Sequence, residues 1–223
     1  MLVVAVGTGC RQESGAPQHG ATQRADALTP LTKAQLADAL PEDGELNGFT
    51  TKTQASILLE AQDVVSVDEA ACRPIADMMS VRPRHPRKAM VWATLKPDEA
   101  PPEASPGSVV LSSHAVEDAV AWMAELKEAL TDCAEFTAVS QRGWTFRFIV
   151  QSLPATKAGD DSATYVLTNT AVGAQGGNTM TVVRTGAVFA TYLMNEVAGK
   201  PNPIPAEAAQ QQHRKLQAAL KQS

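Results

Sequence analysis

The spacing of the apolar residues changes after Cys133, and this change limits the folds open to the chain. From Trp144 onward they recur at every second position, so that Trp144, Phe146, Phe148 and Val150 share one face of an extended segment. Three more strand-like runs follow, ATYVLTNTAV, NTMTVVRT and AVFATYLM, with short turns between them. Successive side chains of a strand point to opposite faces, so the pattern indicates a sheet with one packed face. Short turns join neighbouring strands antiparallel.

Before Cys133 the apolar spacing is mostly helical. The clearest helix is predicted over residues 114–132, with an apolar stripe of Val116, Val120, Met123 and Leu130 beside Ala119, Trp122 and Leu126. Shorter helices are expected from Thr32 to Leu40 and over residues 70–79, and a final helix from Pro205 to about Leu220. Two strand-like runs, AMVWATLK and SVVLSS, precede the longest helix.

These elements predict a single α+β domain, in which a largely antiparallel sheet of four or five strands has helices packed on one face. The chain has 223 residues, 44% apolar and 19% charged, and is long enough to form its own core. Its formal net charge of -5 argues against nucleic acid as a partner, because binding to phosphates needs an excess of Lys and Arg.

The first residues read MLVVAVGTG, an apolar run that closes in small residues before Cys10. This is similar to the end of a bacterial lipoprotein signal peptide, in which the cysteine receives a diacylglyceryl group. We therefore expect a partial signal peptide over residues 1–10, lipid attachment at Cys10 and a flexible tether over residues 11–29. The alternative is a frayed apolar tail with a chance cysteine. A spanning helix is not expected, because it needs ~20 apolar residues.

Cys72 and Cys133 both lie inside the region expected to fold. In an exported protein, pairing is the better interpretation, because oxidising compartments favour disulfides. The alternative is two independent thiols in the core. Their spacing matches no zinc motif, since no histidine accompanies them.

The order of features over roughly residues 30–222 resembles a known family. The features are ALPEDGELNGF after an early helix, CRPIADMM, AVAWMAELKEALTDC, GDDSATYVLT, VVRTGAVFATYLM and a closing helix. They resemble the extracellular sensor domain of PknH-type actinobacterial serine/threonine kinases and its free-standing lipoprotein relatives. The resemblance implies that residues 30–223 sense a ligand or the cell wall without a catalytic apparatus. It also implies a stand-alone lipoprotein, because no kinase motif occurs, and one disulfide where members commonly carry two.

The sequence offers only weak candidates for catalytic residues. His114 is placed to pair with Glu117 or Asp118 at a helix start, but no nucleophile signature accompanies it. Asp160 and Asp161 are adjacent in a turn, where hydrogen bonding to the backbone is the commoner role. The sequence contains no G-x-S-x-G, HExxH or P-loop motif, so we predict no enzyme, metal or cofactor.

The basic cluster of Arg82, Arg84, Arg87 and Lys88 is the most prominent charged feature. Pro83 and Pro86 stiffen this segment, which makes it a candidate site for anionic polymers or lipid headgroups. The alternative is a solvated loop. His19 and His213 are expected to be solvated, and at least two tryptophans, Trp122 and Trp144, to be in the core.

Three functions follow as hypotheses. The first is a ligand-binding or sensor lipoprotein on the extracellular face of the cell membrane, with an unknown small molecule or envelope component as partner. The second is a structural or protein-interaction role in the cell envelope, which predicts a flat apolar patch. The third is an enzyme, which requires a cleft with a perturbed acid or base.

Overall fold

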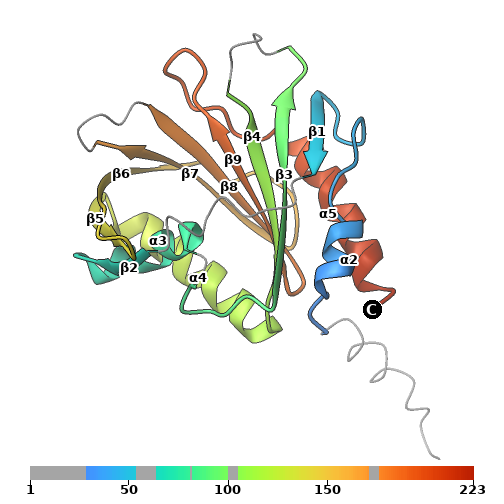
Figure 1. Cartoon of the computed structure of the whole chain (residues 1–223), viewed down its shortest axis with the longest axis horizontal. Helices are drawn as coiled ribbons and strands as arrows, with labels where there is room; N and C mark the ends of the chain where they lie inside the picture. The colour runs from blue at the N-terminus through green and yellow to red at the C-terminus, as the bar shows by residue number, and fades with distance from the viewer. Residues whose placement is uncertain (1–28, 54–63, 81, 100–104, 171–175) are drawn as a thin grey trace, which may run out of the picture.

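A single antiparallel sheet is the centre of the molecule (Figure 1). The computed structural model describes residues 29–53, 64–80, 82–99, 105–170 and 176–223. Within these ranges nine strands pair in the order β1-β3-β4-β9-β8-β7-β6-β5-β2. They are β1 (Phe49–Thr53), β2 (Val64–Val67), β3 (Ala89–Pro97), β4 (Gly107–Ser113), β5 (Glu135–Ser140), β6 (Thr145–Leu153), β7 (Asp161–Asn169), β8 (Gly177–Thr185) and β9 (Val188–Asn195).

The described helices are α2 (Lys33–Asp38), α3 (Arg73–Met79), α4 (Val116–Asp132) and α5 (Ala206–Leu220), and a 3-10 turn, η2 (Ala70–Cys72), leads into α3. Thr32 begins α2 with a capping box: its hydroxyl accepts from the Gln35 amide, and the Gln35 side chain accepts from the Thr32 amide. The predicted helices are therefore all present. Among the described residues, no helix is long and apolar enough to cross a membrane.

The sheet is larger than the four or five strands that the sequence predicts. The α+β class and the antiparallel pairing are confirmed, but β1, β2 and β5 were not expected. Both edge strands are short, and β1 reads FTTKT with alternating buried and exposed positions only at its start. A strand of this kind forms because a neighbour offers backbone hydrogen bonds, so its own sequence carries little signal.

Helices cover both faces of the sheet, and the prediction of one covered face is wrong. One core contains Val183, Ala190 and Leu216 and includes residues of α2 and α5, while the opposite core contains Val182, Phe189 and residues of α3 and α4. Adjacent residues of β8 and β9 thus enter different cores. The two pairs of helices lie apart in Figure 1, with α3 and α4 near β5 and β6, and α2 and α5 near β1.

The buried face of α4 is rotated from the expected stripe. Its buried residues are Ala119, Trp122, Met123, Leu126 and Ala129. Val120, expected in the stripe, is 49% exposed. The side of α4 that bears Trp122 packs against α3 and the sheet, because this side carries the largest apolar area that one face of the helix can bury.

Candidate functional site

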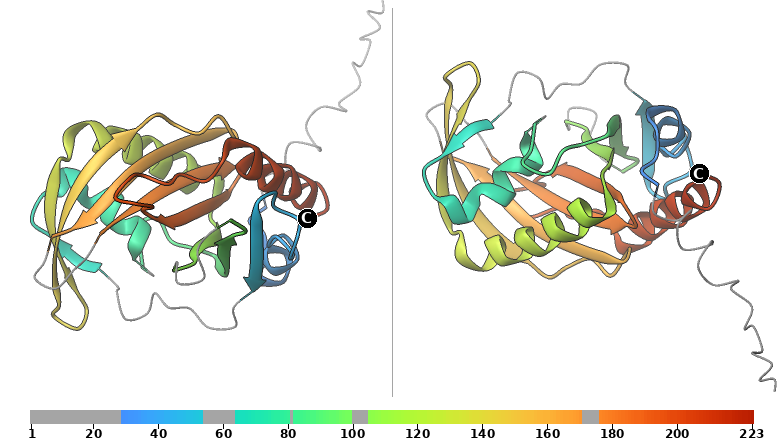
Figure 2. Two further views of the ribbon diagram at one scale, coloured as in Figure 1. Left: turned by 90° about the horizontal axis from the view of Figure 1, so that it is seen from above. Right: turned by 90° about the horizontal axis from the view of Figure 1, so that it is seen from below.

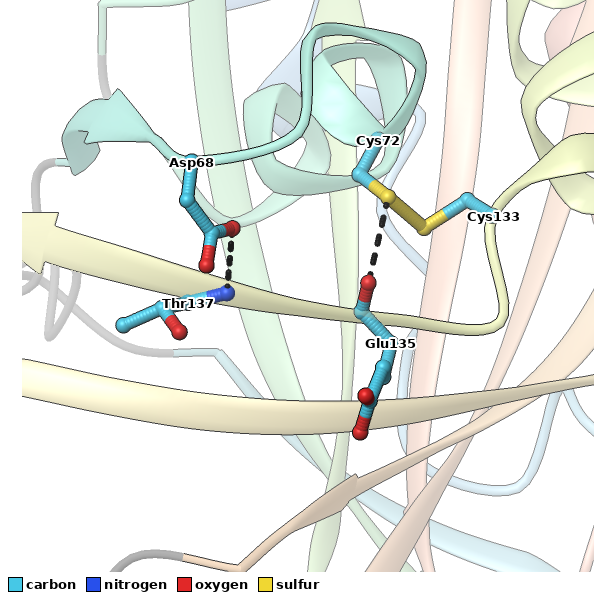
Figure 3. The surroundings of a disulfide bond; sticks show 5 residues. All are labelled: Asp68, Cys72, Cys133, Glu135 and Thr137. Carbon is cyan, nitrogen blue, oxygen red and sulfur yellow. Dashed lines mark hydrogen bonds between the residues drawn. A yellow bond between two sulfur atoms is a disulfide. The ribbon is translucent and has the colours of Figure 1, made fainter.

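The predicted disulfide between Cys72 and Cys133 is present. It joins the 3-10 turn η2 to the residue that follows α4, across a Cα–Cα distance of 5.2 Å. Figure 3 shows that the Sγ atom of Cys72 also faces the carbonyl oxygen of Glu135, 3.6 Å away. The bridge therefore ties the α3–α4 layer to the start of β5.

A cavity of about 280 Å³ lies beside this disulfide. Both cysteines line it, together with four carboxylate residues, Asp68, Glu69, Asp132 and Glu135, and one cation, Arg147. The Asp68 carboxylate accepts a hydrogen bond of 2.7 Å from the Thr137 amide (Figure 3), which lowers the pKa of Asp68. Arg147 is 3.1 Å from Glu135. The cavity is thus polar and negatively charged.

A second hollow, of about 180 Å³, adjoins the first, since Ala71 and Asp132 line both. Its other charged lining residues are Glu125 and Glu128 on α4 and Arg84 in the basic segment. Together the two hollows form a mostly acidic surface along the C-terminal half of α4. Such a surface favours cationic or hydrogen-bonding ligands over anions.

The basic segment, residues 82–88, is not fully solvated, because it is anchored to a buried carboxylate. The Asp77 carboxylate is buried and lies 2.7 Å from Nε of Arg73 and 3.1 Å from Nε of Arg84. Arg84 also lies 3.2 Å from Glu125.

Arg87 points into the protein as well, toward the carbonyl oxygens of Ser80 and Asp77. Its guanidinium lies over the Trp122 ring, 5.3 Å from the centroid. Two of the four predicted cations thus hold the segment in place, and the side chains of Arg82 and Lys88 are exposed.

His85 connects the same segment to α4. Its Nδ1 atom is 3.2 Å from Asp118 and its Nε2 atom is 3.1 Å from Glu125. The ring also stacks on Trp122 at a centroid distance of 6.0 Å. Sequence reasoning missed this residue. The signal was the seven-residue spacing of Asp118 and Glu125, which places both carboxylates on one side of a helix.

His114 differs from its prediction. It does not pair with Glu117 or Asp118 but lies buried, with Nε2 3.0 Å from the Ser112 hydroxyl and its ring against Trp122 and Phe189. Burial, followed by the charge of Arg87, lowers its pKa to about 4, although the nearby Pro86 carbonyl favours protonation. His114 is thus a neutral core residue at ordinary pH, and among the described residues no carboxylate bonds to its other ring nitrogen, Nδ1, as a catalytic histidine beside the Ser112 hydroxyl would need.

The remaining candidates have structural partners. Asp160 accepts from the Gly186 amide at 2.7 Å, and Asp161 accepts from Lys127 at 3.0 Å. His213, expected to be solvated, is buried and 2.7 Å from the Thr185 hydroxyl. In the described part of the chain, no group of three or more His, Cys, Asp or Glu is arranged to hold a metal ion. Cys10 and His19 lie outside the described residues.

Trp122 is fully buried as predicted, but Trp144 is 51% exposed, and the prediction that it belongs to the core is wrong. It does share a face with Phe146 and Phe148, and Phe148 is part of the core under α3 and α4. The predicted alternation of side chains between the two faces of this strand is therefore correct. The helices, however, do not extend far enough along the hairpin to cover its tip.

The fold is similar to that of a solved extracellular domain. The extracellular domain of PknH from Mycobacterium tuberculosis superposes with a TM-score of 0.51 and 12% sequence identity, over 88% of this chain and all of that domain. No family model matches the chain, and no curated protein matches it in sequence. The likeness shows a shared fold, as the order of features in the sequence implied, and none of these comparisons indicates an enzyme family.

Proposed function

We propose that the chain is a non-catalytic extracellular binding or sensor domain, held at the outer face of a cell membrane by a lipid on Cys10. The observation that carries this proposal is the fold, since the similar solved structure is an extracellular domain and the similarity covers 88% of the chain. The Cys72–Cys133 disulfide supports export, because reducing compartments disfavour such bonds.

The cavity beside the disulfide is the best supported binding site. Its carboxylates fit a cationic or hydrogen-bonding small molecule. The predicted anion contact of Arg82, Arg84, Arg87 and Lys88 remains a proposal, to which Lys88 brings an exposed ammonium group, whereas Arg84 and Arg87 also bind within the protein.

Mass spectrometry of the N-terminus, together with detergent phase partitioning of the protein from its own host, tests the anchor. The native chain is expected to carry a diacylglyceryl group and to enter the detergent phase, whereas Cys10→Ser is expected to remain in the aqueous phase. An uncleaved, unacylated N-terminus in the native chain would refute the anchor while leaving the binding function open.

Native mass spectrometry of the purified protein, before and after exposure to an envelope extract, tests the binding function. We expect a bound species of defined mass that is lost in Asp132→Asn, which alters a residue shared by both hollows. The control is Glu117→Gln, which removes a carboxylate from the first turn of α4, outside either hollow. A protein that stays empty, or a species retained in Asp132→Asn, would count against the cavity as the binding site.

A further inference from the structure

The hairpin of β5 and β6 presents an exposed tryptophan at its tip. Trp144 is 51% exposed, whereas Trp92 and Trp122 are 9% and 0% exposed. In both views of Figure 2 the hairpin projects from the body at the end opposite α2 and α5. A large aromatic side chain left half in water keeps apolar area that a partner can still bury.

Hydrogen bonds hold this tip in one shape. The Gly143 amide donates to the Ser140 carbonyl at 2.9 Å, and the Ser140 amide donates to the Trp144 carbonyl at 2.8 Å. The Trp144 amide donates to the Ser140 hydroxyl at 3.1 Å. Gly143 has a φ of 76°, which few other residues adopt. The turn thus fixes the backbone that carries Trp144, which lowers the entropic cost of presenting its indole to a partner.

The charge of the hairpin is opposite to that of the chain. The hairpin, residues 135–153, contains two arginines and one carboxylate, Glu135, and thus has a net charge of +1 in a chain with a net charge of -5. The Arg142 guanidinium lies over the Trp144 ring at 5.6 Å from its centroid. Arg147 is compensated by Glu135. The tip therefore combines one planar aromatic surface with one cation, and it favours an anionic partner.

We propose that the hairpin tip binds an anionic carbohydrate chain, with a sugar ring stacked on Trp144 and a carboxylate or phosphate of the chain paired with Arg142. Guanidinium groups bind both of these anions through paired hydrogen bonds. Gln141 and Thr145 beside the tryptophan are exposed and polar, so they can bond to sugar hydroxyls.

The same neighbours argue against two other partners. An interfacial membrane anchor or the centre of a protein interface needs a broad apolar surface, but the exposed apolar area at this tip comes from a single ring flanked by polar and glycine residues. This inference does not depend on the lipid anchor or on the cavity beside the disulfide, because the hairpin is tested on purified protein without a membrane.

Calorimetric titration of the whole oxidised chain against four probes tests the proposal. Polygalacturonate offers both sugar rings and carboxylates, dextran only rings, polyglutamate only carboxylates, and phosphatidylglycerol vesicles an anionic membrane. We expect measurable binding to polygalacturonate and at least ~10-fold weaker binding to the other three, because stacking and charge contribute together.

Two substitutions locate the site. Trp144→Ala is expected to weaken binding to polygalacturonate by about 10-fold, as removal of one stacking ring does elsewhere, and Trp144→Phe by less. Arg142→Gln is expected to weaken it by about 5-fold and to reduce its dependence on salt. The matched controls are Val197→Ala and Arg214→Gln, an exposed apolar residue and an exposed arginine elsewhere. Unchanged thermal unfolding confirms that each variant is folded.

Four outcomes would overturn the proposal. Absence of binding to polygalacturonate would exclude a carbohydrate of this class. Equal binding to polyglutamate would reduce the site to simple charge attraction. Stronger binding to the vesicles would make the tip a membrane contact. Full affinity in folded Trp144→Ala would move any binding away from the hairpin.

Discussion

His114 shows how burial decides the chemistry of a single side chain. Its ring is enclosed by Trp122 and Phe189, and its Nε2 atom lies within hydrogen-bond distance of the Ser112 hydroxyl. Because burial penalises the charged form, the pKa of His114 in the folded protein is lowered to about 4, against 6.5 for an ordinary histidine. The folded protein therefore keeps this histidine neutral at pH values where an exposed histidine is charged. The unfolded chain therefore binds a proton at a pH where the folded chain does not.

This difference predicts a loss of stability in acid. Between about pH 7.5 and pH 5 the pKa shift of His114 should remove about 2 kcal/mol of the free energy of unfolding, and the loss should level off below pH 4. Urea unfolding of the native chain and of His114→Gln at both pH values measures it. The other titrating groups contribute equally to the pH dependence of both proteins. An equal pH dependence of the free energy of unfolding in the two proteins would therefore contradict the prediction.

Asp77 is a buried carboxylate that holds two arginines from different segments, Arg73 and Arg84. We expect Asp77→Asn to lower the free energy of unfolding by about 2–3 kcal/mol, because charge-assisted hydrogen bonds are lost and the amide of asparagine meets two cations. Chemical denaturation measures this. The control is Glu128→Gln, an exposed carboxylate on α4, with an expected change below about 0.5 kcal/mol. Similar losses in the two variants would show that Asp77 is not a structural anchor.

Among the elements, the disulfide joins η2 to the end of α4 across 61 residues of sequence. On the chain-entropy model such a bridge stabilises the fold by about 4 kcal/mol, since it restricts the unfolded chain. The double variant Cys72→Ala/Cys133→Ala should lose about this much in urea unfolding. Adding a reductant should destabilise the native chain by a similar amount and leave the variant unchanged. A loss of less than about 1 kcal/mol would mean that packing of α3 on α4 suffices without the bridge.

At the scale of the whole molecule, two cores share one sheet. Neighbouring residues of β9, Phe189 and Ala190, enter opposite cores, so neither core can unfold without disturbing strands that the other needs. We therefore expect one cooperative transition for the domain.

Two substitutions test this coupling. Leu111→Ala creates a cavity on one face and Leu126→Ala on the other, and both side chains are fully buried. Each should cost about 2–5 kcal/mol. In each variant, far-ultraviolet circular dichroism and tryptophan fluorescence should follow the same urea curve. Separate curves in either variant would show that the two faces unfold independently.

Much of the fold was predictable from local patterns. The period of 2 in β6 to β9, the capping residues of α2 and the helical spacing of α4 are properties of neighbouring residues, so the sequence indicates these elements directly. The disulfide was also predictable, because it followed from two cysteines in a chain expected to be exported. The contacts of the basic segment were harder to predict, since His85 pairs with Asp118, which is 33 residues away in the sequence.

The sequence by itself determined the α+β class, the antiparallel pairing of consecutive strands and the positions of the helices, because these depend on residues within one turn or one strand of each other. The tertiary structure decided which helix covers which face, the formation of β1, β2 and β5, the burial of His114 and His213, and the exposure of Trp144. Those properties depend on how far each helix extends over the sheet. That extent is set by contacts between segments far apart in the chain, which no local pattern records.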